Sequence, residues 1–375
     1  MALGLATTLI ACLTMKGFRE NIEKKLTSFA GHLQVAKYSL NRSYEEPPLE
    51  RHKLQGLKQA FPTTINATKA FAHKAVLLKT AEDVEGIVCK GLDPEAAHNN
   101  LSTYLTAGQL IDFEHQGYNH DIVLSTQIAN RLRVQVGDEV VAYVVQQPPR
   151  YRKLRVVGLY STHIAELDAK LAFCDLRLIQ RLNNWPDNLV GGYEIFLHDL
   201  QQTKATTDQL LAWLDYDLGV KTTASEYAAI FDWLGIVRKN ALIFMVLILL
   251  VSSSNLASIV LIQMMERTSM IGILKTLGAS DGQIQRMMLW NNLYMVGQGM
   301  LWGNFVGIGL CALQKYWKLV ALNPIYYYTN YVPIAWDWGI ILGLNVLTLV
   351  VVVAVLLISI AFIVRLRPTR AIRFR

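Results

Sequence analysis

Residue types that could carry out chemistry occur in this sequence without the spacing that chemistry requires. The two closest of the eight histidines, His115 and His120, are five positions apart, which does not place both on one face of a helix. We therefore interpret them as surface-loop residues rather than metal ligands. The sequence contains no CxxC, P-loop, HExxH or GxSxG pattern. It predicts no catalytic residue, no cofactor and no metal site, and hence a protein that is not itself an enzyme.

The four cysteines leave one possible disulfide open. Cys12 and Cys311 lie in apolar runs, so Cys89 and Cys174 are the only candidates for a pair in the polar part of the chain. The residues around both are typical of β-strands, but the sequence does not indicate whether the two strands are neighbours. A disulfide and two free thiols therefore both remain open.

Three uncharged apolar runs are long enough to cross a membrane. Ala241 to Met265, Leu289 to Gln314 and Trp338 to Val364 contain 25, 26 and 27 residues without a charge. About 20 such residues span a hydrocarbon core of about 30 Å. Ion-coupled carriers usually place charged groups at the membrane centre, and these runs contain none. The pattern therefore indicates a membrane protein that is not powered by ion coupling and depends on a partner for energy.

The first 15 residues, Met1 to Met15, are also uncharged and apolar, but the run is short. It is the outer part of a membrane helix truncated at its start, a signal peptide without the usual basic segment, or a lipoprotein signal in which Leu9 to Cys12 forms the lipobox. We favour the first interpretation. It predicts an α-helical membrane protein with four transmembrane helices.

Basic residues set the orientation of these helices. The segment Glu266–Met288 contains Arg267, Lys275 and Arg286, and the tail 365–375 contains five arginines. Short loops rich in Lys and Arg face the cytoplasm, so we expect both segments there. The net charge of +7 then reflects cytoplasmic flanks of a membrane protein rather than a nucleic-acid surface. The long segment before residue 241 and the loop 315–337 must lie on the extracytoplasmic side.

A large extracytoplasmic α+β domain is therefore expected between the first and second helices. Short strand and helix patterns interleave without a regular βαβ repeat, which predicts a mixed sheet. Apolar stripes at helical spacing predict two stalk helices, one from Phe18 to Phe29 and one from Tyr227 to Val237. The expected strands are Leu33–Tyr38, Val84–Gly91, Ile122–Leu124, Glu139–Gln147 and Lys153–Tyr160, and the expected helices Thr126–Leu132, Asp175–Leu182 and Thr207–Leu214.

Three further features of the membrane part can be interpreted from the sequence. Gly299, Gly303 and Gly307 are spaced for close helix packing. Ser252 to Asn255 either form interhelical hydrogen bonds or line a cavity. Aromatic residues crowd the loop 315–337, where they form an interfacial belt or contact a substrate. These aromatic residues, with the first of the following helix, are Tyr316, Trp317, Tyr326, Tyr327, Tyr328, Tyr331, Trp336 and Trp338.

The predicted cytoplasmic loop carries a short amphipathic helix. Met270, Ile271, Leu274 and Leu277 form its apolar side, and Gly278 is suited to end it. A short helix with apolar side chains at this position is suited to docking into a groove of a partner protein.

This loop resembles the signature of the FtsX/MacB/LolC-LolE superfamily of ABC transporter permeases. Glu266-Arg267, Ile271-Gly272, Leu274-Lys275 and Leu277-Gly278-Ala279 match that pattern, and Arg367 to Arg373 resembles the closing motif of the superfamily. In the outer domain, Ile122–Ser125, Ala129–Leu132 and Val136–Asp138 are similar to another of its motifs. Lys153–Tyr160, with Glu166–Asp168 and Leu171–Phe173, resembles the lipoprotein-releasing branch. Family members normally begin with a cytoplasmic helix and a full first span, whereas this chain starts inside that span.

The resemblance implies a permease subunit that works with two cytoplasmic ATPase subunits and a second permease, either an identical copy or a paralogue. It implies extraction of lipoproteins from the inner membrane for a periplasmic carrier, and a multi-pass location in that membrane. A MacB-like efflux permease, an FtsX-like signalling permease and a receptor or scaffold without transport remain as alternatives. The residues implied to couple to the ATPase are Glu266, Arg267, Met270, Ile271, Leu274, Lys275, Leu277, Gly278 and Ala279.

The expected organisation follows from these boundaries. It consists of a first transmembrane helix (1–15), the extracytoplasmic domain with its stalks (16–240), a second helix (241–265), a coupling loop (266–288), a third helix (289–314), an outer loop (315–337), a fourth helix (338–364) and a basic tail (365–375).

Overall fold

The structure is a computed structural model that describes residues 1–39, 45–54, 56–94, 101–113, 118–146, 148–199 and 202–365. His115 and the basic tail beyond residue 365 lie outside the described residues. The chain divides into two compact units. We call them the helical unit, made of Met1–Asn21, Asp232–Leu322 and Tyr331–Arg375, and the sheet domain, made of Ile22–Phe231 and Asn323–Asn330.

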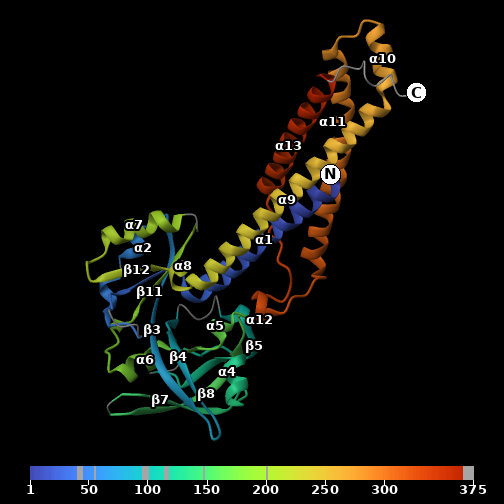
Figure 1. Cartoon of the computed structure of the whole chain (residues 1–375). Coiled ribbons are helices and arrows are strands. Elements are labelled where there is room, and N and C mark those ends of the chain that lie inside the picture. The colour runs from blue at the N-terminus through green and yellow to red at the C-terminus, as the bar shows by residue number, and fades with distance from the viewer. Residues whose placement is uncertain are drawn as a thin grey trace. The chain divides into compact units, whose positions relative to one another are not determined.

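Long helices form the helical unit (Figure 1). Three of them are long and apolar enough to cross a membrane, by length and composition. Helix α1 is not among these, because its uncharged run ends at Met15, before Lys16. The structure therefore confirms three of the four expected membrane helices. The elements are α1 (Ala2–Ala30), α9 (Ala228–Glu266), α10 (Thr268–Thr276), α11 (Asp281–Trp317) and α13 (Trp338–Arg365), and α1 and α9 each continue into the sheet domain.

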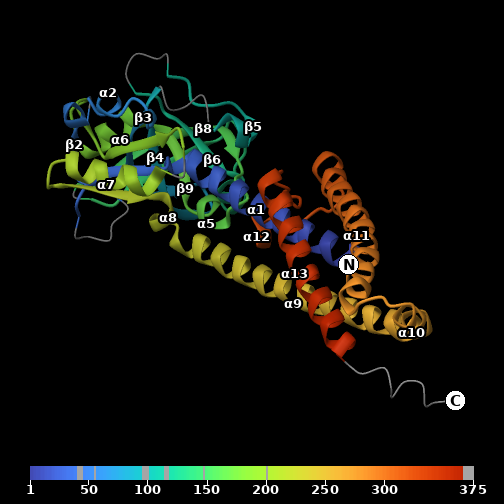
Figure 2. The same ribbon diagram turned by 90° about the horizontal axis from the view of Figure 1, so that it is seen from above.

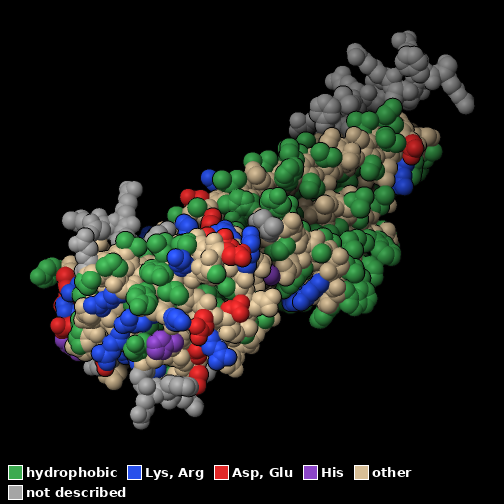
Figure 3. All heavy atoms as spheres, turned by 90° about the horizontal axis from the view of Figure 1, so that it is seen from below, with side chains coloured by type: hydrophobic (Ala, Val, Ile, Leu, Met, Phe, Trp, Pro, Cys, Tyr) green, Lys and Arg blue, Asp and Glu red, His purple; other side chains and the backbone are tan. Residues whose placement is uncertain are grey.

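Apolar and small residues hold the helices of this unit together. Leu5, Leu9 and Leu13 of α1 are buried in one cluster with Cys311 of α11 and with residues of α13. Between α11 and α13, Asn304 and Asn345 exchange two hydrogen bonds, with N···O distances of 2.7 and 2.9 Å. Such a pair satisfies polar groups that would otherwise be costly in hydrocarbon. Figure 3 shows hydrophobic side chains over the helical unit, whereas charged side chains gather on the sheet domain.

The sheet domain contains a mixed sheet, as predicted. Its strands follow the order β12-β1-β11-β3-β4-β9-β6-β8-β5, and β7 pairs with both β3 and β8. The β4–β9 and β6–β8 pairs are parallel and the others are antiparallel. The strands are β1 (Leu33–Lys37), β3 (Ile65–Lys79), β4 (Val84–Leu92), β5 (Leu105–Gly108), β6 (Asp121–Ser125), β7 (Glu139–Val144), β8 (Arg150–Tyr160), β9 (Leu171–Asp175), β11 (Gly192–Leu197) and β12 (Leu218–Thr222), and a separate pair joins β2 (Leu49–Glu50) to β10 (Leu189–Val190).

Part of this sheet closes on itself. Following the pairs β3–β4–β9–β6–β8–β7 leads back to β3, because Leu77–Lys79 at the end of β3 pairs with β7. Alternate residues of these strands point into one core, as the period of two along a strand requires. Val76, Leu78, Ile87, Cys89, Ile122, Leu124, Val140, Ala142, Leu154, Val156, Ala172 and Cys174 are buried in it.

Short helices complete the sheet domain and pack along its strands (Figure 2). Helix α6 begins at the buried Asp175, whose side chain accepts a hydrogen bond from Arg177 N, and Ser125 caps α4 in the same way. Such caps satisfy the free N–H groups of the first turn. The helices are η1 (Arg51–Leu54), α2 (Leu57–Ala60), η2 (Ser102–Tyr104), α4 (Thr126–Leu132), α5 (Ala165–Asp168), α6 (Leu176–Asn183), α7 (Thr203–Trp213), α8 (Thr223–Glu226) and α12 (Pro324–Tyr327).

All five expected strands and all three expected helices of this domain are present, with ends shifted by a few residues. The prediction missed β3, the longest strand. Its sequence, Ile65–Lys79, mixes lysines and alanines with apolar residues without a period of two, and its extended form is fixed by pairing with β11, β4 and β7. The short strands β2, β5, β9, β10, β11 and β12 were also missed.

Candidate coupling site

Helix α10 joins the two long helices α9 and α11. Arg267 separates it from α9 and is exposed, as is Glu266 at the end of α9. Gly278 ends it with a φ of +91°, a conformation that favours glycine, and Ala279 N donates to Leu274 O at 3.0 Å. Ser280 then starts α11 through a reciprocal pair of hydrogen bonds with Gln283. The predicted helix and its glycine stop are therefore present.

The side chains of α10 divide into two groups. Met270, Ile273 and Leu277 are 38%, 59% and 79% exposed. Ile271 instead packs against the buried cluster that contains Leu256, Val260 and Met288, and Leu274 is half-buried. The exposed apolar stripe of α10 is therefore Met270, Ile273 and Leu277.

This stripe differs from the predicted one. The prediction included Ile271 and Leu274, which the helix turns towards the buried side, and omitted Ile273. Spacing alone could have found Ile273, because positions i, i+3 and i+7 lie on one side of a helix. What the sequence does not show is which of two adjacent stripes faces the rest of the protein.

An ion pair fixes the end of α10 to the start of α11. Lys275 Nζ lies 2.7 Å from the carboxylate of Asp281 in the first turn of α11. The negative charge of Asp281 also suits its place at a helix N-terminus. Ile271 and this ion pair hold α10 against α9 and α11, while the exposed apolar stripe of α10 stays uncovered.

The three glycines predicted for helix packing lie along α1. A Cβ on Gly303 would be 2.8 Å from the Ala2 carbonyl oxygen, and one on Gly307 would be 3.0 Å from Ala6 Cα. Gly299 has more room, at 3.4 Å from Met1 Cβ. Glycine at position 303 therefore permits a backbone approach that any larger residue would prevent.

The polar residues Ser252 and Asn255 of α9 line a cavity of about 130 Å³. Asn292 of α11 contributes to the same cavity, and its side-chain amide donates to Met288 O at 2.9 Å. The cavity interpretation of this polar patch, one of the two left open by the sequence, fits these positions.

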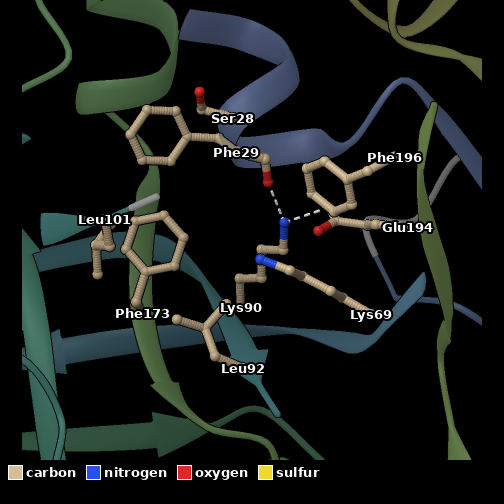
Figure 4. A pocket seen from close by; sticks show the side chains of 9 residues that line it. All are labelled: Ser28, Phe29, Lys69, Lys90, Leu92, Leu101, Phe173, Glu194 and Phe196. Carbon is tan, nitrogen blue, oxygen red and sulfur yellow. Dashed lines mark hydrogen bonds and ion pairs between the residues drawn. The ribbon is translucent and has the colours of Figure 1, made fainter. Parts of the chain in front are cut away.

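A buried ion pair that the sequence did not indicate lies where α1 ends in the sheet domain (Figure 4). Lys90 of β4 and Glu194 of β11 form an ion pair, and both residues are less than 5% exposed. The Lys90 ammonium group also donates to the carbonyl oxygen of Phe29, in the last turn of α1. That carbonyl has no partner within the helix, so Lys90 caps α1 from the sheet.

Aromatic rings pack around the same corner. The Phe29 ring lies 4.9 Å from that of Tyr104 and 5.8 Å from that of Phe173, measured between centroids. A cavity of about 20 Å³ beside them has room for a single water molecule, so it cannot hold a lipid chain. This corner attaches the outer end of α1 firmly to the sheet.

Lys25, one turn earlier on α1, makes a second attachment. Its ammonium group donates to the carbonyl oxygens of Thr162 (2.9 Å) and Tyr328 (2.7 Å). Residues 323–330, which belong to the sheet domain, are thereby packed within it, and Asn330 Nδ2 lies 3.0 Å from His163 Nε2. Burial lowers the pKa of Lys25 to about 8, although the nearby charge of Asp168 opposes the shift.

Asp168 organises the backbone of this attachment. Its carboxylate accepts hydrogen bonds from Thr162 N and Thr162 Oγ1, at 3.1 and 2.7 Å, and from His163 N at 3.0 Å. Ser161 Oγ lies 2.9 Å from His163 Nδ1. Although Ser, His and Asp meet here, the carboxylate orients the backbone N–H of His163 and not its ring, so the arrangement differs from a nucleophilic triad.

Cys89 and Cys174 are free thiols in the structure. They lie on the adjacent parallel strands β4 and β9, where Gly91 is opposite Cys174 and Cys89 is opposite Ala172. The hydrogen bond with the neighbouring Cys89 thiol, together with burial, raises the pKa of Cys174 well above its ordinary value. The two strands are therefore neighbours, a point the sequence left open.

Comparison with known proteins agrees with the signature in the coupling loop. The family profile described as FtsX-like permease C-terminal matches residues 242–368, which include α10. Over 393 aligned residues the chain is 24% identical to the "Lipoprotein-releasing system transmembrane protein LolC" of Neisseria meningitidis serogroup B, covering 99% of this chain and 89% of that protein. Residues 242–368 are therefore an FtsX-like permease domain.

The similarity of the whole chain lies with the LolC/LolE branch. It is 22% identical over 319 residues to the "Lipoprotein-releasing system transmembrane protein LolE" of Haemophilus influenzae, covering 82% of this chain and 74% of that protein. Among solved structures, the periplasmic region of MacB from Actinobacillus actinomycetemcomitans aligns with a TM-score of 0.37 and 12% identity, over 56% of this chain and 97% of that one. These similarities support an ABC transporter permease, a class whose ATPase is a separate partner.

Proposed function

We propose that this permease extracts lipoproteins from the inner membrane and passes them to a periplasmic carrier, using ATP hydrolysed by a separate subunit. The observation that carries the proposal is the similarity to LolC, which extends over nearly the whole chain and includes both units. A second permease, identical or paralogous, completes the transporter. Helix α1 supplies the fourth membrane helix, and its buried leucines Leu5, Leu9 and Leu13 favour this role.

In this proposal α10 is the coupling helix. Met270, Ile273 and Leu277 enter an apolar cleft of the ATPase, because they are the exposed apolar side chains of the helix. Ile271 and the Lys275–Asp281 ion pair transmit the movement of α10 to α9 and α11. Helices α1 and α9 continue from the helical unit into the sheet domain, so both can carry the movement onward.

Co-purification of the ATPase with variants of α10 tests this coupling. Ile273→Asp places a charge in the proposed apolar contact, and burying an unpaired charge is strongly unfavourable. We expect the ATPase to be lost from the purified complex. Ser269→Asp is the matched control, because it adds the same charge to an exposed polar position of the same helix.

The ATPase should remain bound to the Ser269→Asp variant. Retention of a fully coupled ATPase by Ile273→Asp would rule out α10 as the contact. A wild-type chain that co-purifies no ATPase would instead favour a receptor or scaffold. The half-buried Leu274 is a poorer test position, because a charge there also disturbs packing within the permease.

A further inference from the structure

The end of α11 and the start of α13 meet the middle of α1 at one level, on the side of the helical unit opposite α10. Ala335 N donates to Leu13 O of α1 at 3.2 Å, just before α13 begins. At the end of α11, Gln314 bonds to Val320 N and O and to Val332 O, at 2.9 to 3.2 Å. Ala321 and Tyr331 add a β-bridge between the same two segments. The chain segments on both sides of residues 323–330 are therefore firmly held here.

Two lysines are held over aromatic rings at this level. Lys315 Nζ lies 5.9 Å from the centroid of Trp336, and Lys318 Nζ lies 4.5 Å from that of Tyr331. The aromatic faces attract the ammonium groups but leave their N–H donors free. Trp336 is itself braced by Trp338, at 5.7 Å between ring centroids. The rings fix two positive charges in place.

In the described part of the chain, these two charges have no acidic neighbour to neutralise them. Asp337 is the only acidic residue between 315 and 338. It is paired with Lys16 of α1, and it caps α13 by accepting from Gly339 N at 2.7 Å. Among the described residues, neither Lys315 nor Lys318 has a carboxylate partner within ion-pair distance.

The surroundings are exposed and apolar. Tyr316, Trp317 and Leu319 are 79%, 70% and 62% exposed, and Trp338 is 60% exposed. Tyr316 and Trp317 end the apolar helix α11, Leu319 follows it and Trp338 begins α13, so these residues stand where hydrocarbon gives way to lipid headgroups. Anionic headgroups at this depth would complement the two uncompensated ammonium groups.

We propose that Lys315 and Lys318, with Trp336 and Tyr331, bind the phosphate of an anionic phospholipid in the leaflet opposite α10. The apolar side chains beside them contact the upper part of its acyl chains. This inference concerns a bound membrane lipid and does not depend on which substrate the permease transports.

Native mass spectrometry of the full-length chain, purified together with the subunits that stay bound to it, tests the proposal, with phosphatidylglycerol and phosphatidylcholine added at equal concentration. We expect the wild type to retain phosphatidylglycerol preferentially. Lys315→Gln with Lys318→Gln should reduce that retention about fivefold or more, because a lysine near an anionic surface contributes about a factor of five. Both lysines are exposed, so the variant should fold normally.

Two controls sharpen the experiment. Lys58→Gln with Lys204→Gln removes the same charge from exposed positions of the sheet domain and should retain lipid as the wild type does. Lys315→Arg with Lys318→Arg should restore retention, since arginine keeps both the charge and the aromatic contact. Added inorganic phosphate should not displace the lipid, because it lacks the acyl chains.

Three results would overturn the proposal. The first is equal retention of the two lipids by the wild type. The second is unchanged retention of phosphatidylglycerol by the glutamine variant. The third is a glutamine variant that keeps its lipid but loses a protein subunit, which would show that the two lysines face a protein rather than a membrane.

Discussion

Burial in the fold changes the acid–base chemistry of Lys25. It donates to two carbonyl oxygens, those of Thr162 and Tyr328, and a neutral amine has two N–H donors. Deprotonation therefore preserves both bonds. Burial is the main cause of the low pKa of about 8, against an ordinary value of 10.5.

This shift predicts a pH dependence of stability. The folded protein binds fewer protons than the unfolded chain between pH 8 and 10.5, so the contribution of Lys25 to stability rises with pH in that window. Below pH 8 its buried charge opposes folding in full. We expect the thermal midpoint of the wild type to increase relative to that of Lys25→Met as the pH rises from 8 to 10.

Thermal unfolding of the full chain in detergent measures this difference. Lys24→Met is the control, because it removes an exposed lysine from the same helix. If the thermal midpoint of the wild type, relative to that of Lys25→Met, stays constant or falls from pH 8 to 10, the lowered pKa of Lys25 is contradicted.

Residues such as Lys25 and Lys90 could not be identified from the sequence. The partners of Lys25 are 137 and 303 positions away, and Glu194 is 104 positions from Lys90. No local pattern relates positions that far apart. By contrast, Gly278 could be assigned its role, because a helix stop depends only on neighbouring residues.

At the scale of elements, the corner between α1 and the sheet depends on the buried Lys90–Glu194 ion pair. Removing one partner leaves the other charge buried and unpaired, which typically costs about 3 to 5 kcal/mol. We expect Glu194→Leu to lower the free energy of unfolding by about that amount. Chemical denaturation of the full chain in detergent, followed by circular dichroism, provides the measurement.

The double variant Lys90→Met with Glu194→Leu separates charge from packing. Apolar replacement of a whole buried ion pair is often nearly neutral. The double variant should therefore recover most of the lost free energy of unfolding. We expect it to stay about 1 kcal/mol below the wild type, because Phe29 O loses its donor. A double variant no more stable than the single one would show that the unpaired charge is not the cause.

Elements were predictable where their signal was local. Helix α4 and strands β6 and β7 follow from short runs of residues with clear propensity. Strand β3 could not be predicted, because three partner strands impose its extended form. The same limit applies to α10. The sequence predicted that this helix exists, but which of its sides stays exposed depends on how Ile271 packs against α9 and α11.

At the scale of the whole molecule, the composition of the sequence predicted more of the architecture than residue patterns did. Uncharged runs identified α9, α11 and α13 as membrane helices, and the interleaved strands indicated a mixed-sheet domain. The closure of β3 onto β7 was not predictable, because it joins segments distant in sequence. The signature in the coupling loop indicated the FtsX-like family, and the family profile matches residues 242–368, which include this loop.

The central claim is ATP-driven release of lipoproteins, and reconstitution tests it most directly. The permease, with its co-purified ATPase and second permease, is placed in proteoliposomes that contain an acylated lipoprotein, and a soluble periplasmic carrier is added outside. We predict transfer of the lipoprotein to the carrier with ATP and none with a non-hydrolysable analogue. ATP hydrolysis by the intact complex without any transfer, or transfer that is equal in both nucleotides, would contradict the account.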